Sequence, residues 1–156
     1  MNKNKFRGKR IDNGEWVYGG YHKHIKRTAC PIEDKITDED IAYLIIESGF
    51  SDWNMPKPIN VYEVIPETVG QFTGLKDKND KEIWQGDILK TDSEVNYVDY
   101  QDYSFGTHNH RQLIDYIWGT SIGELHYFDD VFEVIGNIYD NPELLESEMN
   151  ENDISD

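Results

Sequence analysis

Residues 67–90, ETVGQFTGLKDKNDKEIWQGDILK, show the clearest structural pattern in the 156-residue chain. Two runs that contain apolar side chains flank the polar hexapeptide 76–81. Asn79 and Asp80 at its centre suit a turn, because both side chains tolerate positive φ and can bond to their own backbone. The stretch therefore predicts a β-hairpin whose turn type stays open. Gly86 in the second run indicates a bulge or the close approach of another backbone.

A second hairpin is predicted over residues 5–22. Asn-Gly at 13–14 separates two runs with apolar side chains, and this dipeptide is the strongest short signal for a hairpin. Basic side chains gather before the turn: Lys3, Lys5, Arg7, Lys9 and Arg10. Such charges most often lie on a solvated edge strand, and the alternative is that they bind an acidic partner.

The clearest helical pattern spans residues 37–49. Its first residue, a threonine, is a suitable N-cap, and Asp40 stands at the capping-box position. Ile41, Leu44 and Ile45 fall on one stripe at helical spacing, and the glycine at the end of the segment is a natural stop. We therefore expect a helix at about 37–49 that packs on the sheet.

The rest of the chain is predicted to alternate between loops and extended segments. Residues 50–58 should form a loop, because two prolines in three positions neither continue a helix nor pair as a central strand. Residues 91–110 are either a mobile loop or an edge strand. Asn141 and Pro142 mark the start of a short C-terminal helix. Further extended segments are predicted at 60–65, 113–118, 125–128 and 131–139.

Three parts of the chain carry motifs that resemble a known family. The central motif lies in residues 68–88, the segment 132–144 reads FEVIGNIYDNPEL, and the opening combines KFRG at 5–8 with GEWVYG at 14–19. Together they resemble the YopX-like proteins of phages and prophages. Asp80 departs from the family, whose turn often has glycine there, and the match is poor over 28–60 and 92–126. The resemblance implies a β-rich fold with a small barrel and carries over no catalytic residue.

Pattern and resemblance together predict a β-rich α+β fold. We expect a twisted antiparallel sheet that curls into a small barrel, with one helix at about 37–49 and a short C-terminal helix. The length predicts a single YopX-like domain over residues 1–146, followed by an acidic C-terminal tail at 147–156. The predicted core consists of Trp16, Val69, Phe72, Ile83, Ile88, Leu89, Ile114, Ile117, Phe132, Val134, Ile135 and Ile138.

The net charge of −16 is unevenly distributed. Residues 1–27 hold eight basic and two acidic side chains, a net charge of +6, so the remainder carries −22. A surface this acidic repels phosphate groups, and direct nucleic-acid binding is not expected. Solubility is the ordinary reason for such a charge. The alternative is a surface that mimics DNA or binds a basic protein.

Composition also bears on location. No apolar run approaches the roughly 20 residues of a membrane span, so no contact with a membrane is expected. The only cysteine, Cys30, excludes an internal disulfide and suits a reducing compartment. We therefore expect the protein in the cytoplasm of a bacterial host.

The histidines are the only candidates for a metal site. His22 with His24, and His108 with His110, stand at i and i+2, and residues so spaced on a strand share one face. His126 and Cys30 are further donors. No carboxylate or cysteine stands at a diagnostic spacing from either pair, so we assign no metal, cofactor or catalytic residue.

Other motifs point to structure rather than chemistry. The glycines at 70, 74 and 86 match neither a P-loop nor a dinucleotide fingerprint, and they fit turns and bulges of a curved sheet. Glu67, Asp77 and Asp87 would matter for catalysis only if they met in a pocket with raised pKa values.

The sequence therefore favours a phage accessory protein of unknown activity that binds a protein partner of unknown identity. An enzyme is not expected, because no catalytic motif is present. The alternative is a metal-dependent hydrolase that uses the paired histidines. The opposite charges of the two parts of the chain also make a homo-oligomer an open alternative to a monomer.

Overall fold

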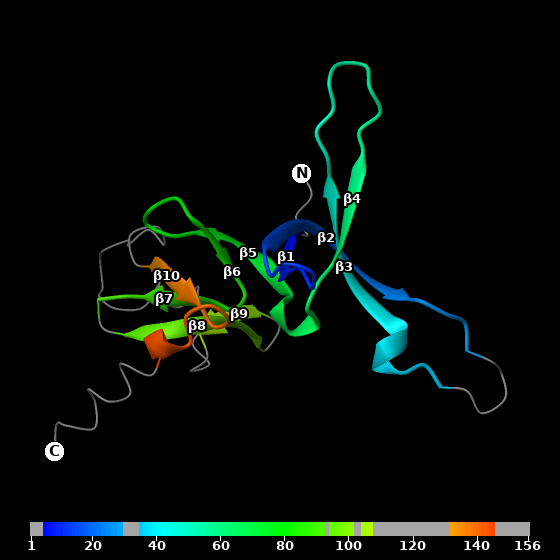
Figure 1. Cartoon of the computed structure of the whole chain (residues 1–156). Helices are drawn as coiled ribbons and strands as arrows, with labels where there is room; N and C mark the ends of the chain where they lie inside the picture. The colour runs from blue at the N-terminus through cyan, green and yellow to red at the C-terminus, as the bar shows by residue number, and fades with distance from the viewer. Residues whose placement is uncertain (1–4, 30–34, 93, 102–103, 108–131, 146–156) are drawn as a thin grey trace. The chain divides into compact units, whose positions relative to one another are not determined.

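The computed structural model describes residues 5–29, 35–92, 94–101, 104–107 and 132–145 (Figure 1). The chain divides into two compact units, residues 1–71 and 72–156. The division falls within strand β5 (Gly70–Lys76). The single domain over 1–146 stays a prediction, and the tail 147–156 lies outside the described residues. No helix in the described part of the chain has the length and apolarity that crossing a membrane requires.

The first unit is built from antiparallel strands. Their order across the sheet is β4 (Ile59–Glu63), β3 (Ile41–Ser48), β2 (Trp16–Ile25) and β1 (Phe6–Lys9). The first two residues of β5 pair with β1 on its other side. The predicted hairpin over 5–22 is confirmed, because β1 and β2 pair in register from Phe6↔Gly19 to Lys9↔Trp16. Gly14 in its turn has a φ of 73°, a conformation that glycine adopts without steric cost.

The predicted helix at 37–49 is wrong. Residues 38–40 form one turn of 3-10 helix, η1 (Asp38–Asp40), and the chain then continues as strand β3. The predicted capping contact forms, because the Thr37 backbone N–H donates to Asp40 Oδ2 at 2.9 Å. It stabilises only this one turn. β3 pairs with β2 on one side and β4 on the other. Its isoleucines and tyrosine suit a strand, and pairing on both sides overrides the helical spacing.

The predicted barrel is not found, although the first unit curls. An isolated bridge joins Arg10 to Val64, so the chain after β1 lies beside the chain after β4. Val64 is completely buried there, and its backbone N–H donates to the Tyr43 carbonyl at 2.8 Å. A Cβ added to Gly8 would come within 3.1 Å of the Val64 side chain. A small residue at position 8 therefore permits the close contact that bends the sheet, which stays open over the described residues.

The central stretch forms three strands rather than one hairpin. β5 pairs with β6 (Glu82–Trp84) across the predicted turn, where Asp80 has a φ of 65°. The second run is then interrupted at Gly86, and β7 (Asp87–Lys90) belongs to a separate four-stranded antiparallel sheet. The order of this sheet is β10 (Glu133–Asn137), β7, β8 (Val95–Gln101) and β9 (Ser104–Thr107).

The remaining element predictions have mixed outcomes. β4 and β10 confirm the extended segments at 60–65 and 131–139, whereas 113–118 and 125–128 lie outside the described residues. The segment 91–110 contributes β8 and β9 rather than a loop alone, and among the described residues β9 is the last strand of its sheet. Residues 143–145 are helical. The N–H of Leu144 donates to the carbonyl of Asn141, so the C-terminal helix begins where it was predicted.

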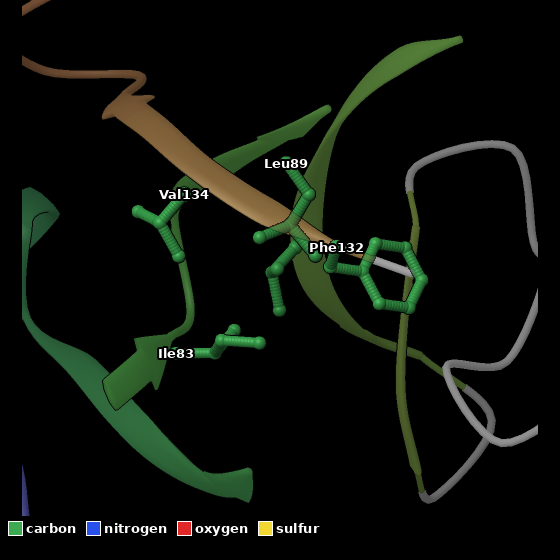
Figure 2. Close-up of a cluster of buried hydrophobic side chains, with 5 residues drawn as sticks. Ile83, Leu89, Phe132 and Val134 are labelled. Atoms are coloured by element: carbon green, nitrogen blue, oxygen red, sulfur yellow. The ribbon is translucent and has the colours of Figure 1, made fainter. Parts of the chain in front are cut away.

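A cluster of buried apolar side chains lies in the second unit (Figure 2). Ile83, Leu89, Val98, Phe132 and Val134 pack together, each at most 8% exposed. Of the predicted core, Ile83, Ile88, Leu89, Phe132 and Val134 are buried, and Trp16, Val69, Phe72, Ile135 and Ile138 are half-buried. Ile114 and Ile117 lie outside the described residues. Ala42, Ile45, Val64, Trp84 and Val98 are buried without having been predicted.

Candidate interaction surface

The carboxylate of Asp77 holds the β5–β6 turn together. It is 2% exposed, and its Oδ1 accepts the backbone N–H groups of Asn79 at 2.8 Å and Lys81 at 2.9 Å. Its Oδ2 accepts the N–H of Val134 at 2.9 Å. Burial by itself would raise the pKa of Asp77, but the three backbone donors outweigh burial and lower that pKa. A carboxylate held in its charged form by backbone donors serves the fold rather than proton transfer.

Asp87 and the glycines of the central stretch also serve turns. Asp87 is 2% exposed, and its Oδ2 accepts the N–H of Trp84 at 2.9 Å across the β6–β7 turn. Gly86 in this turn has a φ of 84°, and Gly74, with a φ of 87°, lies where the β5–β6 register shifts. The predicted turns and bulges are confirmed at these two positions. Glu67 is exposed and lies in the first unit.

The basic side chains near the N-terminus make contacts within their own unit. The Arg7 guanidinium is buried and lies 4.6 Å from the centre of the Trp16 ring, and the Lys9 ammonium lies 5.5 Å from the same ring. Arg10 pairs with Asp12 and covers the Tyr62 ring at 4.8 Å. Arg7, Lys9 and Arg10 are thus engaged within the first unit, whereas Lys3 lies outside the described residues, so binding of an acidic partner by this cluster stays a hypothesis.

One of the two histidine pairs can be placed. His22 and His24 are exposed on β2, and their ring centres are 6.2 Å apart. The described residues contain no group of three or more His, Cys, Asp or Glu side chains that could enclose a metal ion. His108, His110, His126 and Cys30 lie outside the described residues, so the meeting of the two pairs stays a hypothesis.

The loop between β3 and β4, residues 49–58, forms the tip of a long two-stranded arm (Figure 1). We call these residues the hairpin tip. The Gly49 N–H donates to the Pro58 carbonyl at 2.8 Å and closes the base of the tip. A Cβ on Gly49 would lie 2.7 Å from Pro58 Cγ, so only glycine fits there. Asn54, with a φ of 63°, turns the chain at the far end, where the Met55 N–H donates to the Asp52 carbonyl at 3.1 Å.

The hairpin tip exposes large apolar side chains. Trp53 is 92% exposed, Phe50 86% and Met55 65%, and Ile59 at the start of β4 is 71% exposed. The tip carries one acidic and one basic side chain, Asp52 and Lys57, and so has no net charge. A neutral, aromatic loop in a chain of charge −16 differs from its surroundings in the way that protein-binding surfaces do.

The prediction of a loop at 50–58 is confirmed, but the sequence analysis does not single out its exposed apolar side chains. The prolines that identified the loop say nothing about the neighbouring aromatic side chains. A usable signal was present, because Phe50, Trp53 and Met55 are large apolar residues in a segment that has neither helical nor strand periodicity. No helix or strand directs the side chains of such residues into a core.

Comparison with protein families gives a match over nearly the whole chain. The model of the YopX protein family matches residues 5–146. No curated protein sequence matches the chain. Among solved structures, the crystal structure of protein EF1440 from Enterococcus faecalis is similar, with 25% sequence identity and a TM-score of 0.45. The match covers 91% of this chain and 97% of that one.

Proposed function

Because the chain belongs to the YopX protein family, we propose that it is a phage-encoded accessory protein that acts by binding a protein partner in the bacterial cytoplasm. The single observation that supports this proposal is the exposed hairpin tip with Trp53 and Phe50. Trp and Phe are enriched in protein interfaces, and Trp is frequent among the residues that contribute most binding energy. The partner surface should be a mainly apolar pocket, because the tip has no net charge to offer.

Burial of the apolar side chains of the tip would supply enough free energy for a specific protein contact. Full burial of a Phe or Met side chain contributes about 1.5–3 kcal/mol, and Trp offers more apolar area still. Part of this gain is offset by the loss of rotational and translational freedom on binding. Hydrogen bonds at both ends of the tip reduce the cost of ordering it.

Affinity capture with matched variants tests the proposal. The bait is the full chain, and cells that carry the corresponding phage or prophage provide the lysate. We expect a specific partner to be recovered by the natural chain and lost with the double variant Phe50→Ser/Trp53→Ser. The control is Ile11→Ser, which removes a side chain that is 57% exposed in the β1–β2 turn, away from the tip.

Purified partner then gives the quantitative result. Titration calorimetry should show binding that is weakened at least tenfold by the double variant and unchanged by Ile11→Ser. Equal binding by the double variant would show that the tip is not the contact. Turnover of a substrate by the chain, without any specific partner, would overturn the proposal of a binding protein.

A further inference from the structure

His22 and His24 are placed as a pair that can act on one ligand. They alternate with Lys23 along β2 and therefore project from the same face of the strand. Their backbones are paired with Leu44 and Ala42 of β3, which fixes their positions. Both side chains are exposed, and neither makes a hydrogen bond or ion pair with another described residue. Their nitrogens are therefore available to a ligand from solvent.

The separation of the two rings suits chelation. Two imidazoles that bind one tetrahedral ion through nitrogen, at about 2.0–2.1 Å, have ring centres roughly 5 Å apart. The observed separation is 6.2 Å. Exposed side chains on a paired strand can close this difference by rotating about χ1 and χ2, without any movement of the backbone.

The neighbouring cations are engaged elsewhere. The Lys23 ammonium lies 5.5 Å from the centre of the Tyr43 ring, on the other face of the strand. The Lys26 ammonium pairs with Glu63 at 3.2 Å. A divalent cation at the histidine pair would therefore meet less repulsion than the basic sequence around residues 22–27 suggests.

We propose that His22 and His24 form a two-imidazole binding site for a divalent cation that prefers nitrogen ligands, such as Zn²⁺ or Ni²⁺. Imidazole suits these ions, whereas Mg²⁺ and Ca²⁺ prefer oxygen ligands. Two protein ligands leave the other coordination positions to water. The site is thus open, and it does not depend on the hairpin tip or on the proposed protein partner.

Zinc titration of the untagged full chain tests the site. The probe is ZnCl₂ followed by calorimetry, with MgCl₂ as the comparison ion. We expect His22→Ala and His24→Ala each to weaken zinc binding at least tenfold, because each leaves a single imidazole. The control is His108→Ala/His110→Ala, which removes the other His-x-His pair of the sequence and should change the affinity less than twofold.

Equal losses in the two single variants, with binding retained in the control, support the proposal. It is overturned if the natural chain binds no zinc or binds Mg²⁺ equally well. It is also overturned if only one of the two single substitutions weakens binding, since that result indicates one ligand rather than a chelate. Loss of zinc binding in the His108→Ala/His110→Ala control would assign the ion to the other pair.

Discussion

Asp77 shows how one side chain can join parts of a chain that are far apart in sequence. Two of its three backbone donors are local, at Asn79 and Lys81, but the third belongs to Val134, 57 residues away. The turn itself could be predicted, because Asn-Asp at 79–80 signals it. The bond to Val134 could not, since nothing in the local sequence identifies the strand that Asp77 meets.

Replacement of Asp77 should therefore destabilise the protein. We expect Asp77→Ala to lower the free energy of unfolding by about 3 kcal/mol, because buried N–H groups lose a charged acceptor. Asp77→Asn, which keeps one acceptor oxygen, should cost less. The control is Asp80→Asn, which replaces an exposed side chain in the same turn. It should change the free energy of unfolding by less than about 0.5 kcal/mol. Urea denaturation at neutral pH measures all three, and an unfolding free energy unchanged in Asp77→Ala would contradict the assigned role.

At the scale of elements, β3 shows why a strand can look like a helix. Ala42 and Ile45 are its two buried residues, and along a strand they lie on opposite faces. Residues 41–46, IAYLII, are all apolar or aromatic, so Ile41, Leu44 and Ile45 fit a helical stripe even though the segment is a strand. The sequence pattern cannot distinguish these cases. The pairing with β2 and β4 does, and that pairing depends on residues elsewhere in the chain.

The start of β3 also carries a pH-dependent contact. Arg27 donates to both carboxylate oxygens of Asp40, at 2.6 and 3.0 Å. These bonds, with the Thr37 N–H, lower the pKa of Asp40 from 3.8 to about 2. Because the folded pKa is the lower one, this stabilisation is present above pH 3.8 and is lost as the pH falls toward 2. We expect Arg27→Gln to raise the pKa of Asp40 toward 3.8, as measured by NMR titration of its carboxyl carbon.

Lys26→Gln is the matched control for this titration. The Lys26 ammonium pairs with Glu63 rather than with Asp40, so its removal should leave the Asp40 titration almost unchanged. A midpoint near 3.8 in the natural chain would show that the Arg27 contact does not form in solution.

At the scale of the whole molecule, the uneven charge makes attraction between copies an alternative to a monomer. Several basic side chains of residues 1–27 instead pair within the first unit: Arg10 with Asp12, Lys26 with Glu63 and Arg27 with Asp40. Fewer basic side chains therefore remain for ion pairs between copies. A net charge of −16 acts against association as well.

The molecular mass in solution should therefore not depend on salt. Light scattering at about 0.05 M and about 0.5 M NaCl measures this mass. These two concentrations lie on either side of the ionic strength at which exposed charges more than about 8 Å apart no longer attract each other strongly. We expect the same mass in both. A mass that falls at the higher salt concentration would instead indicate that opposite charges hold copies together. In that case the basic segment, rather than the hairpin tip, would be the first surface to mutate.

The exposure of Trp53 has a spectroscopic consequence. An indole ring in contact with water emits at longer wavelength than one enclosed in protein, and Trp53 is 92% exposed whereas Trp84 is 4% exposed. Subtracting the emission spectrum of a Trp53→Phe variant from that of the natural chain isolates the light that comes from the hairpin tip. Enclosure of the indole in an apolar pocket shifts this component to the blue. The loop thus carries its own fluorescent reporter of whether it is occupied.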